Sequence, residues 1–243
     1  MTTSGTVTYD PVRDVVINGA LRLCGAYNAA NSPRPEQVQH AIEACDMMLN
    51  SWVIDDFLYL KKFIYITLVA DQASYVLSTT TTDAVHSDLA ATLDFLQRPA
   101  RVFFPTRHTV SSTQEVPLTQ ISREEYTTLP NKATTGTTTQ VYYDPQIVAG
   151  RLYIWPVPSD AVDKIILTVT RRIEDVGADT DTYDAPPEML EMIKYQLALR
   201  LSLEYGLTDP QIARLERYAV ALKDKIDGLN RDNASAFFQP DMR

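Results

Sequence analysis

Residues 121–159 read ISREEYTTLPNKATTGTTTQVYYDPQIVAGRLYIWPVPS, and this stretch carries the strongest local signals of the fold. Ser122 followed by Glu125 has the form of a capping box, in which each side chain bonds the free backbone N–H of the other residue. A short helix is therefore expected to begin here. It should end before Pro130, because proline disfavours helical backbone in the residue that precedes it.

The second half of the same stretch predicts a β-hairpin. Its strands are residues 140–143 and 151–155, which are rich in aromatic residues. The Asp144-Pro145 step ends the first strand, and prolines close the second, since proline removes a donor from the hydrogen-bond ladder. A turn at Gly150 joins the two strands. We expect their aromatic side chains to pack against each other across the hairpin.

A pattern of period two extends this β-rich region in both directions. From Phe63 onward both registers of the segment are mostly apolar, which predicts a strand covered on each face. Further strands are expected at residues 101–104, 116–121 and 164–173. The chain from about residue 63 to residue 173 should therefore form an antiparallel β-rich domain.

Four segments outside this region have the three- and four-residue apolar spacing of amphipathic helices. Their expected starts, where a capping residue or a first-turn proline is present, are Asp10-Pro11, Ser32-Pro33, Asp184-Ala185-Pro186-Pro187 and Asp209-Pro210. Because two helices precede the β-rich region and two follow it, we expect one four-helix bundle that holds both ends of an inserted domain.

The predicted fold class is therefore α+β, with a four-helix bundle from the N- and C-terminal helices, an inserted antiparallel β-rich domain and an extended C-terminal tail. The expected parts are residues 1–60 (N-terminal helical hairpin of the bundle), 61–175 (inserted domain), 176–228 (C-terminal helices) and 229–243 (partner-docking tail).

Several short strings of the chain resemble a known family by their order and spacing. They are LNSW at residues 49–52, QASYVL at residues 72–77 and LALRLSLEYGL at residues 197–207, together with residues 121–159. The resemblance is to the head-to-tail adaptors of short-tailed bacteriophages, also called tail accessory or packaged-DNA-stabilisation proteins, and it covers nearly the whole chain. The chain departs from the family's usual form at residues 79–96, a longer, threonine-rich insertion.

The resemblance implies a virion structural protein without enzymatic activity or cofactor. Copies of the chain would form a dodecameric ring beneath the portal protein, extend the DNA channel, retain packaged DNA and provide the attachment site for downstream tail or nozzle proteins. The implied location is the tail or neck of the virion, after assembly in the host cytoplasm.

The composition agrees with a protein that lets DNA pass without binding it tightly. The net charge is −9, from 22 Lys and Arg against 31 Asp and Glu, and no basic stripe is visible. No apolar run approaches the ~20 residues of a membrane helix, and no signal peptide is expected. Cys24 and Cys45 fall on apolar helix faces and are expected to be buried, reduced thiols.

The tail carries two adjacent aromatic residues, Phe237 and Phe238. Exposed aromatics lower solubility unless a partner buries them, and aromatics dominate the energy of interfaces. We therefore predict that the tail docks onto another chain, with Arg231 and Gln239 as polar neighbours of the two phenylalanines. In the resembling family the C-terminal extension reaches the portal protein.

A second candidate surface is a run of five acids without a base: Glu174, Asp175, Asp179, Asp181 and Asp184. One interpretation is a solvated loop between a strand and a helix. The other is a loop that faces the DNA channel and repels phosphate, so that DNA does not adhere. The sequence leaves both interpretations open.

Catalytic and metal sites are weakly indicated. His40, His86 and His108 lie in unrelated segments without metal-ligand spacing. The nearest carboxylate pairs are Asp55-Asp56 and Glu124-Glu125, the type of pair that a cell-wall hydrolase uses. Capping and the helix dipole already explain acids at a helix start. A peptidoglycan-degrading tail component is thus the alternative function, and a cytoplasmic scaffold absent from the virion is a third.

Overall fold

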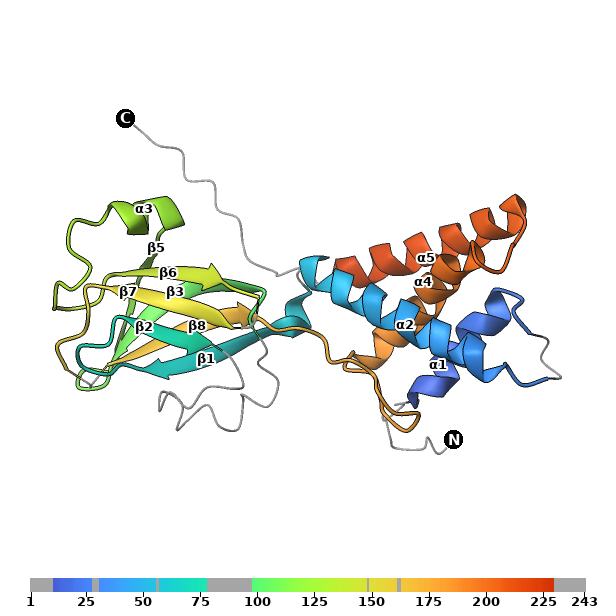
Figure 1. The fold of residues 1–243 in the computed structure, drawn as a ribbon, viewed down its shortest axis with the longest axis horizontal. Helices are drawn as coiled ribbons and strands as arrows, with labels where there is room; N and C mark the ends of the chain where they lie inside the picture. The colour runs from blue at the N-terminus through green and yellow to red at the C-terminus, as the bar shows by residue number, and fades with distance from the viewer. Residues whose placement is uncertain are drawn as a thin grey trace, which may run out of the picture. The chain divides into compact units, whose positions relative to one another are not determined.

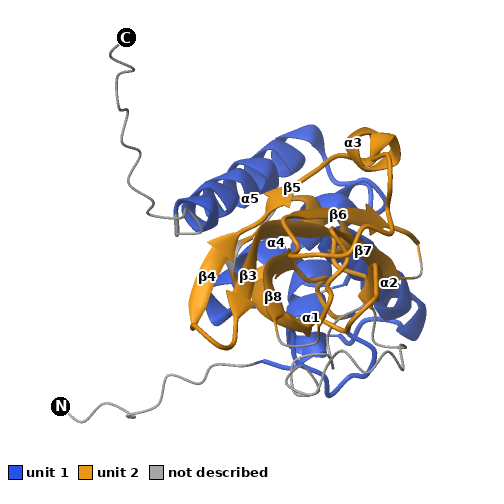
Figure 2. Cartoon of the chain, turned by 90° about the vertical axis from the view of Figure 1, so that its left-hand side faces the viewer, with its two compact units in different colours: residues 1–49, 175–243 blue, residues 50–174 orange. Residues whose placement is uncertain are grey.

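The computed structural model describes residues 11–27, 31–55, 57–77, 98–147, 149–160 and 163–229. These residues hold five α-helices and eight β-strands (Figure 1), so the fold is α+β. The chain divides into two compact units: unit 1 is Met1–Leu49 with Asp175–Arg243, and unit 2 is Asn50–Glu174 (Figure 2). Unit 2 is a continuous segment between the two parts of unit 1.

Unit 2 contains two four-stranded sheets. The first, in the order β1-β8-β3-β4, consists of β1 (Lys61–Thr67), β8 (Lys164–Thr170), β3 (Arg101–Thr109) and β4 (Gln114–Pro117), all antiparallel. The second, in the order β2-β7-β6-β5, consists of β2 (Ser74–Leu77), β7 (Gly150–Trp155), β6 (Gln140–Pro145) and β5 (Thr119–Gln120).

The pairing of β5 with β6 is parallel, so the prediction of a purely antiparallel domain is wrong at this edge. Parallel neighbours need a crossover connection. Here helix α3 (Arg123–Thr128) and the loop after it supply that connection.

The two sheets enclose one apolar core. Alternate residues of each central strand point into it, which is the arrangement of a β-sandwich. The core includes Ile64, Ile66, Leu152, Ile165 and Leu167, each with no exposed surface. Burying a side chain of this size stabilises the fold by about 2 kcal/mol, so unit 2 has the core of a rigid block.

The stretch around α3 confirms the capping box and the hairpin. Ser122 Oγ accepts a hydrogen bond from the Glu125 N–H at 3.2 Å, and the Ser122 N–H donates to the Glu125 carboxylate at 2.6 Å. In the β6-β7 hairpin Tyr142 pairs with Tyr153, and their ring centroids lie 5.8 Å apart. The Tyr126 ring of α3 stacks 5.4 Å from Tyr142 and 5.1 Å from Tyr153, so aromatic packing holds the helix against the hairpin.

Unit 1 is helical. Its helices are α1 (Arg13–Leu23), α2 (Pro35–Trp52, whose last residues belong to unit 2), α4 (Leu190–Ser202) and α5 (Asp209–Leu229); short 3-10 turns lie at Val53–Asp55, Leu58–Leu60 and Pro187–Met189. Helix α4 packs against both α1 and α5. It buries Ile193, Leu197 and Leu201 completely. These contacts join three helices, and the four-helix bundle stays a prediction.

Two predicted helix starts are wrong. The N-cap of α1 is Val12, and its first N–H, from Arg13, bonds the Asp181 carbonyl at 2.8 Å, so a distant loop caps the helix where the sequence predicted Asp10-Pro11. Asp10 itself lies outside the described residues. Helix α2 begins at Pro35, after the predicted Ser32-Pro33, because the Gln37 side chain accepts the Arg34 N–H at 3.0 Å.

Acidification should weaken unit 2 around α3. Asp144 accepts hydrogen bonds from Gln146 at 2.7 Å and from Arg123 at 2.6 Å, and these bonds lower the pKa of its carboxyl. The bonds from Ser122 lower the pKa of Glu125. Both folded-state pKa values thus lie below the ordinary values of 3.8 and 4.5. The stabilisation is complete above about pH 5 and is lost as the pH falls through the folded pKa values.

Thermal unfolding followed by circular dichroism should therefore show a Tm that falls below about pH 4.5. The double variant Asp144→Asn, Glu125→Gln should have a lower Tm at neutral pH and a shallower acid-dependent fall. Glu124→Gln is the matched control, since Glu124 is exposed and lies outside the capping box. A double variant that keeps the full acid-dependent fall would contradict this assignment.

Candidate interaction surfaces

The outward face of the first sheet is exposed where the sequence predicted a covered strand. On β1, Ile64 and Ile66 point into the core, whereas Phe63 is 64% exposed and Tyr65 is 43% exposed. The prediction of cover on both faces is wrong, because within unit 2 the second sheet packs against one face only. We call this outward face the aromatic sheet face, and define it by Lys61, Phe63, Tyr65, Arg101, Phe103, Phe104, His108, Lys164 and Ile166.

The strand register brings these side chains together in rows. One row across β1, β8 and β3 is Phe63, Thr168 and Phe103, and the next is Tyr65, Ile166 and Thr106. A third row, which follows the row of Tyr65, extends onto β4: Thr67, Lys164, His108 and Glu115. Residues in one row are cross-strand neighbours, so Tyr65 lies beside Ile166, and Thr168 lies between Phe63 and Phe103.

An irregularity in β3 adds Phe104 to this surface. The pairing of β3 with β8 shifts between Phe103 and Thr106. Phe104 adopts a positive φ of 45° and is 80% exposed, with its ring centroid 6.2 Å from that of Phe103. A left-handed backbone costs a bulky residue about 1–2 kcal/mol. The fold thus presents an apolar ring to solvent at a conformational cost, which indicates a role in binding.

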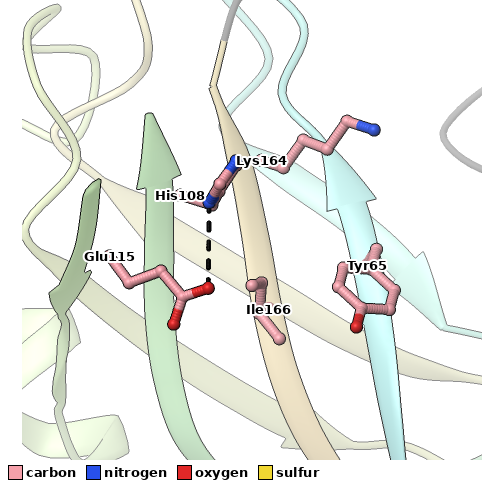
Figure 3. A pocket seen from close by; sticks show the side chains of 5 residues that line it. All are labelled: Tyr65, His108, Glu115, Lys164 and Ile166. Carbon is pink, nitrogen blue, oxygen red and sulfur yellow. Dashed lines mark ion pairs between the residues drawn. The ribbon is translucent and has the colours of Figure 1, made fainter. Parts of the chain in front are cut away.

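At one end of the aromatic sheet face lies an open pocket of about 350 Å³. Its lining, drawn in Figure 3, is Tyr65 of β1, Ile166 and Lys164 of β8, His108 of β3 and Glu115 of β4. His108 Nδ1 lies 3.8 Å from the Glu115 carboxylate, a pairing that requires a protonated imidazole. The lining offers an aromatic ring, an aliphatic side chain and three polar groups, which suits the binding of another surface.

The acidic segment is held against α1 by Arg13. Arg13 is a buried residue with 7% of its surface exposed, and its Nη1 donates to the Gly177 carbonyl at 2.7 Å. The Arg13 N–H bonds the Asp181 carbonyl, and the Asp181 carboxylate accepts the Ala178 N–H at 2.6 Å. The segment is therefore an anchored loop, and part of its negative charge organises the loop itself.

The acids of this segment differ in their surroundings. Glu174, the last residue of unit 2, is exposed, as are Asp175, Asp179 and Asp181 of unit 1, whereas Asp184 is half-buried. Nearby, burial raises the pKa of Asp46 on α2, an effect that a hydrogen bond from Val176 partly offsets. Whether the exposed acids face a DNA channel stays a prediction.

The predicted docking residues of the tail, Arg231, Phe237, Phe238 and Gln239, lie outside the described residues. Asp56 and His86 also lie outside them.

Of the described hydrolase candidates, Asp55 ends the 3-10 turn Val53–Asp55, and the other two lie at the start of α3. Glu125 is bound in the capping box, and Glu124 is exposed beside it. His40 lies on α2 and His108 on β3. Within the described residues no group of three or more His, Cys, Asp and Glu is arranged to hold a metal ion.

Both cysteines are buried free thiols, as predicted. Burial raises the pKa of Cys24 and of Cys45 to about 12. None of the helices in the described ranges is both long enough and apolar enough to cross a membrane.

Two functional features escaped the sequence prediction. The exposure of Phe63 and Tyr65 had a local signal, since the aromatic residues occupy one register of β1 and the isoleucines the other. The anchoring role of Arg13 had none, because its partner Gly177 lies 164 residues away in the chain.

Comparison with known proteins identifies the family. A search of curated proteins finds no match to this chain. A family-level sequence profile described as SU10 adaptor protein matches residues 16–242, which cover unit 2 and most of unit 1. The chain therefore belongs to the SU10 adaptor protein family, a family of phage head-to-tail adaptors.

Proposed function

We propose that this chain is the ring-forming head-to-tail adaptor of a short-tailed phage. Membership of the family implies a structural adaptor role in the tail or neck of the virion, in contact with other head and tail proteins. Our proposal is more specific: the ring binds the portal protein, extends the DNA channel, retains packaged DNA and provides the attachment site for downstream tail proteins. Twelve copies per ring follow from the family resemblance alone.

The observation that carries the proposal is the aromatic sheet face. Its Phe63 and Phe104 are 64% and 80% exposed on a sandwich with a closed apolar core. A rigid sandwich that exposes large aromatic side chains on one face is suited to burial by a partner. The face offers no nucleophile paired with a base, so binding fits it better than catalysis.

The proposed assembly is stepwise. We infer that α2 completes a four-helix bundle with α1, α4 and α5, supported by its buried Ala41, Cys45 and Leu49 and by the contact of Cys45 Sγ with the Tyr183 hydroxyl at 3.9 Å. The tail after Gly228 would order only on the portal protein, and the entropy of that ordering would delay ring formation until the portal is present. Free subunits are then largely monomeric.

Size-exclusion chromatography with light scattering tests this proposal, on the chain alone and mixed with its portal protein. The full chain should form a stoichiometric complex with the portal, and a chain truncated after Gly228 should bind it more weakly. Phe237→Ala with Phe238→Ala should reproduce most of the loss, whereas Arg231→Ala or Gln239→Ala should have smaller effects. A truncated chain that assembles on the portal with undiminished affinity would exclude the tail from docking.

Reversing charge in the acidic segment should change how DNA is held. We propose that the segment faces the channel and repels phosphate. Asp179 is the best position to vary, since it is exposed and Asp181 already bonds the loop backbone. Asp179→Lys should leave the Tm unchanged and slow DNA ejection, and Asp179→Asn should have a smaller effect in the same direction. Unchanged ejection and retention of DNA in particles carrying the lysine would count against a channel position.

A further inference from the structure

We propose that the aromatic sheet face of one subunit docks onto the exposed acidic face of helix α2 in a neighbouring copy of this chain, with Phe104 as the anchor residue. The inference rests on the proposed ring-forming function and assigns the two surfaces that make the ring. It does not involve the tail or the portal protein.

Phe104 provides the first argument. Its positive φ of 45° within a strand is a backbone conformation that glycine or asparagine adopts more easily. The residue there is instead a phenylalanine with 80% of its surface exposed. The ring gives the isolated subunit little burial, so its benefit must come from a surface that covers it. Anchors of this kind sit at the centre of interfaces.

Charge provides the second argument and indicates the occupant. The aromatic sheet face carries three basic side chains, Lys61, Arg101 and Lys164, in a chain whose net charge is −9. Lys61 Nζ also lies 5.4 Å from the centroid of the Phe103 ring, so positive charge and aromatic surface are interleaved. The only carboxylate in the described rows of this face is Glu115 on β4. Its complement is an acidic surface with an apolar component.

Helix α2 has such a surface. It is the one α-helix in the described part of the chain that contains neither Lys nor Arg. Glu36, His40, Glu43 and Met47 follow one another at intervals of four, three and four residues, so they lie on one face, and all four are exposed. Met47 is 60% exposed, and its flexible thioether suits contact with aromatic rings.

The acidic segment around Asp179 fits the aromatic sheet face less well. Its exposed neighbours are Gly177, Ala178 and Thr180, which offer no large apolar side chain to phenylalanine rings. Two copies of the aromatic sheet face would bring like charges together. Sheet face against α2 is a heterologous contact between two different surfaces, and such contacts generate rings when their rotation closes.

Disulfide trapping tests the contact without the portal protein. A Phe63→Cys chain and a Met47→Cys chain are mixed at about 1 mM and oxidised. At this concentration a weak contact between subunits, with a Kd of about 1 mM, is substantially populated. The native thiols at Cys24 and Cys45 are buried and should not form cross-links. The mixture should yield a cross-linked dimer of one chain of each kind, and each chain alone should yield much less. A mixture without the mixed dimer, or one in which Phe63→Cys couples mainly to itself, overturns the proposal.

Phe104→Asn separates binding from folding. Asparagine tolerates the positive φ, so the Tm should stay the same or rise by up to about 3 °C, while the yield of mixed dimer falls at least about tenfold. Ile147→Asn is the matched control, since Ile147 is 90% exposed in unit 2 but lies outside the aromatic sheet face. Equal loss in the two variants, or none at Phe104, contradicts an anchor role.

Charge exchange tests the identity of the occupant. Lys164→Glu should reduce the mixed dimer several-fold, and Glu43→Lys in the partner chain should restore it. Absence of restoration excludes α2 as the complementary surface. Because these measurements use the chain alone, their failure together with intact portal binding would refute only the inferred contact. Loss of portal binding with intact trapping would refute the proposed function instead.

Discussion

Replacing Gly150 with alanine should lower the free energy of unfolding of unit 2 by about 3 kcal/mol. Gly150 begins β7 between β2 and β6, and the Tyr143 ring lies across it. A Cβ at this position would meet the Tyr143 hydroxyl and ring closer than real Cβ atoms approach other atoms. The Tyr143 hydroxyl also donates to the Pro99 carbonyl at 2.6 Å, a bond worth about 1 kcal/mol that the displaced ring would lose.

A double-mutant cycle measures this conflict directly. Gly150→Ala should cost about 3 kcal/mol in the native chain and less than about 0.5 kcal/mol in a Tyr143→Ala background, because the ring that collides with the Cβ is then absent. Urea unfolding followed by tyrosine fluorescence supplies both values. Gly228→Ala is the control: nothing lies within 4 Å of a Cβ there, and alanine favours the helix. If Gly150→Ala costs the same in both backgrounds, the ring contact is not the cause.

The elements that could be predicted are those whose causes lie within a few residues. Ser122 and Glu125 satisfy each other's backbone, and the β6-β7 hairpin follows from alternation and prolines. Helix α5 begins at the predicted Asp209, and the residue before it, Thr208, donates its N–H to the Gln211 side chain at 3.1 Å. In each case the stabilising partner is close in sequence, so a local pattern contains the information.

What could not be predicted depends on distant partners. In β1 the sequence separates an aromatic register from an isoleucine register, but both are apolar, and the position of the second sheet decides that Ile64 is buried and Phe63 exposed. The bulge that exposes Phe104 arises from the register of β3 against β8, a strand that begins only at Lys164. The start of α1 depends on Asp181 in the same way. The candidate surfaces lie at these positions, where local preference and tertiary structure disagree.

Arg13→Ala should destabilise unit 1 by about 3 kcal/mol and loosen the acidic segment. Arg13 is nearly buried, and its Nη1 bond to the Gly177 carbonyl is charge-assisted and short, at 2.7 Å. Its ion pair with Asp14, at 3.0 Å, adds little, because the Asp14 side chain is 38% exposed. The loss therefore comes from the unsatisfied carbonyl and from the apolar stem of the arginine, which alanine does not replace.

Arg13→Met separates these two causes, since methionine keeps the stem and removes the donors. It should cost about 2 kcal/mol, and Arg13→Lys, which keeps one donor, about 1 kcal/mol. Hydrogen exchange should speed up at Ala178, whose N–H bonds Asp181 within the loop, in all three variants and in the order of their destabilisation. A methionine variant as stable as the native chain would show that the donors are dispensable. If Arg13→Met leaves unit 1 folded but mobile at the segment, and the segment faces the channel as proposed, DNA ejection from particles carrying it should be slowed in the same direction as in Asp179→Asn. A loop that moves no longer holds its repelling charges at a set distance from the phosphates.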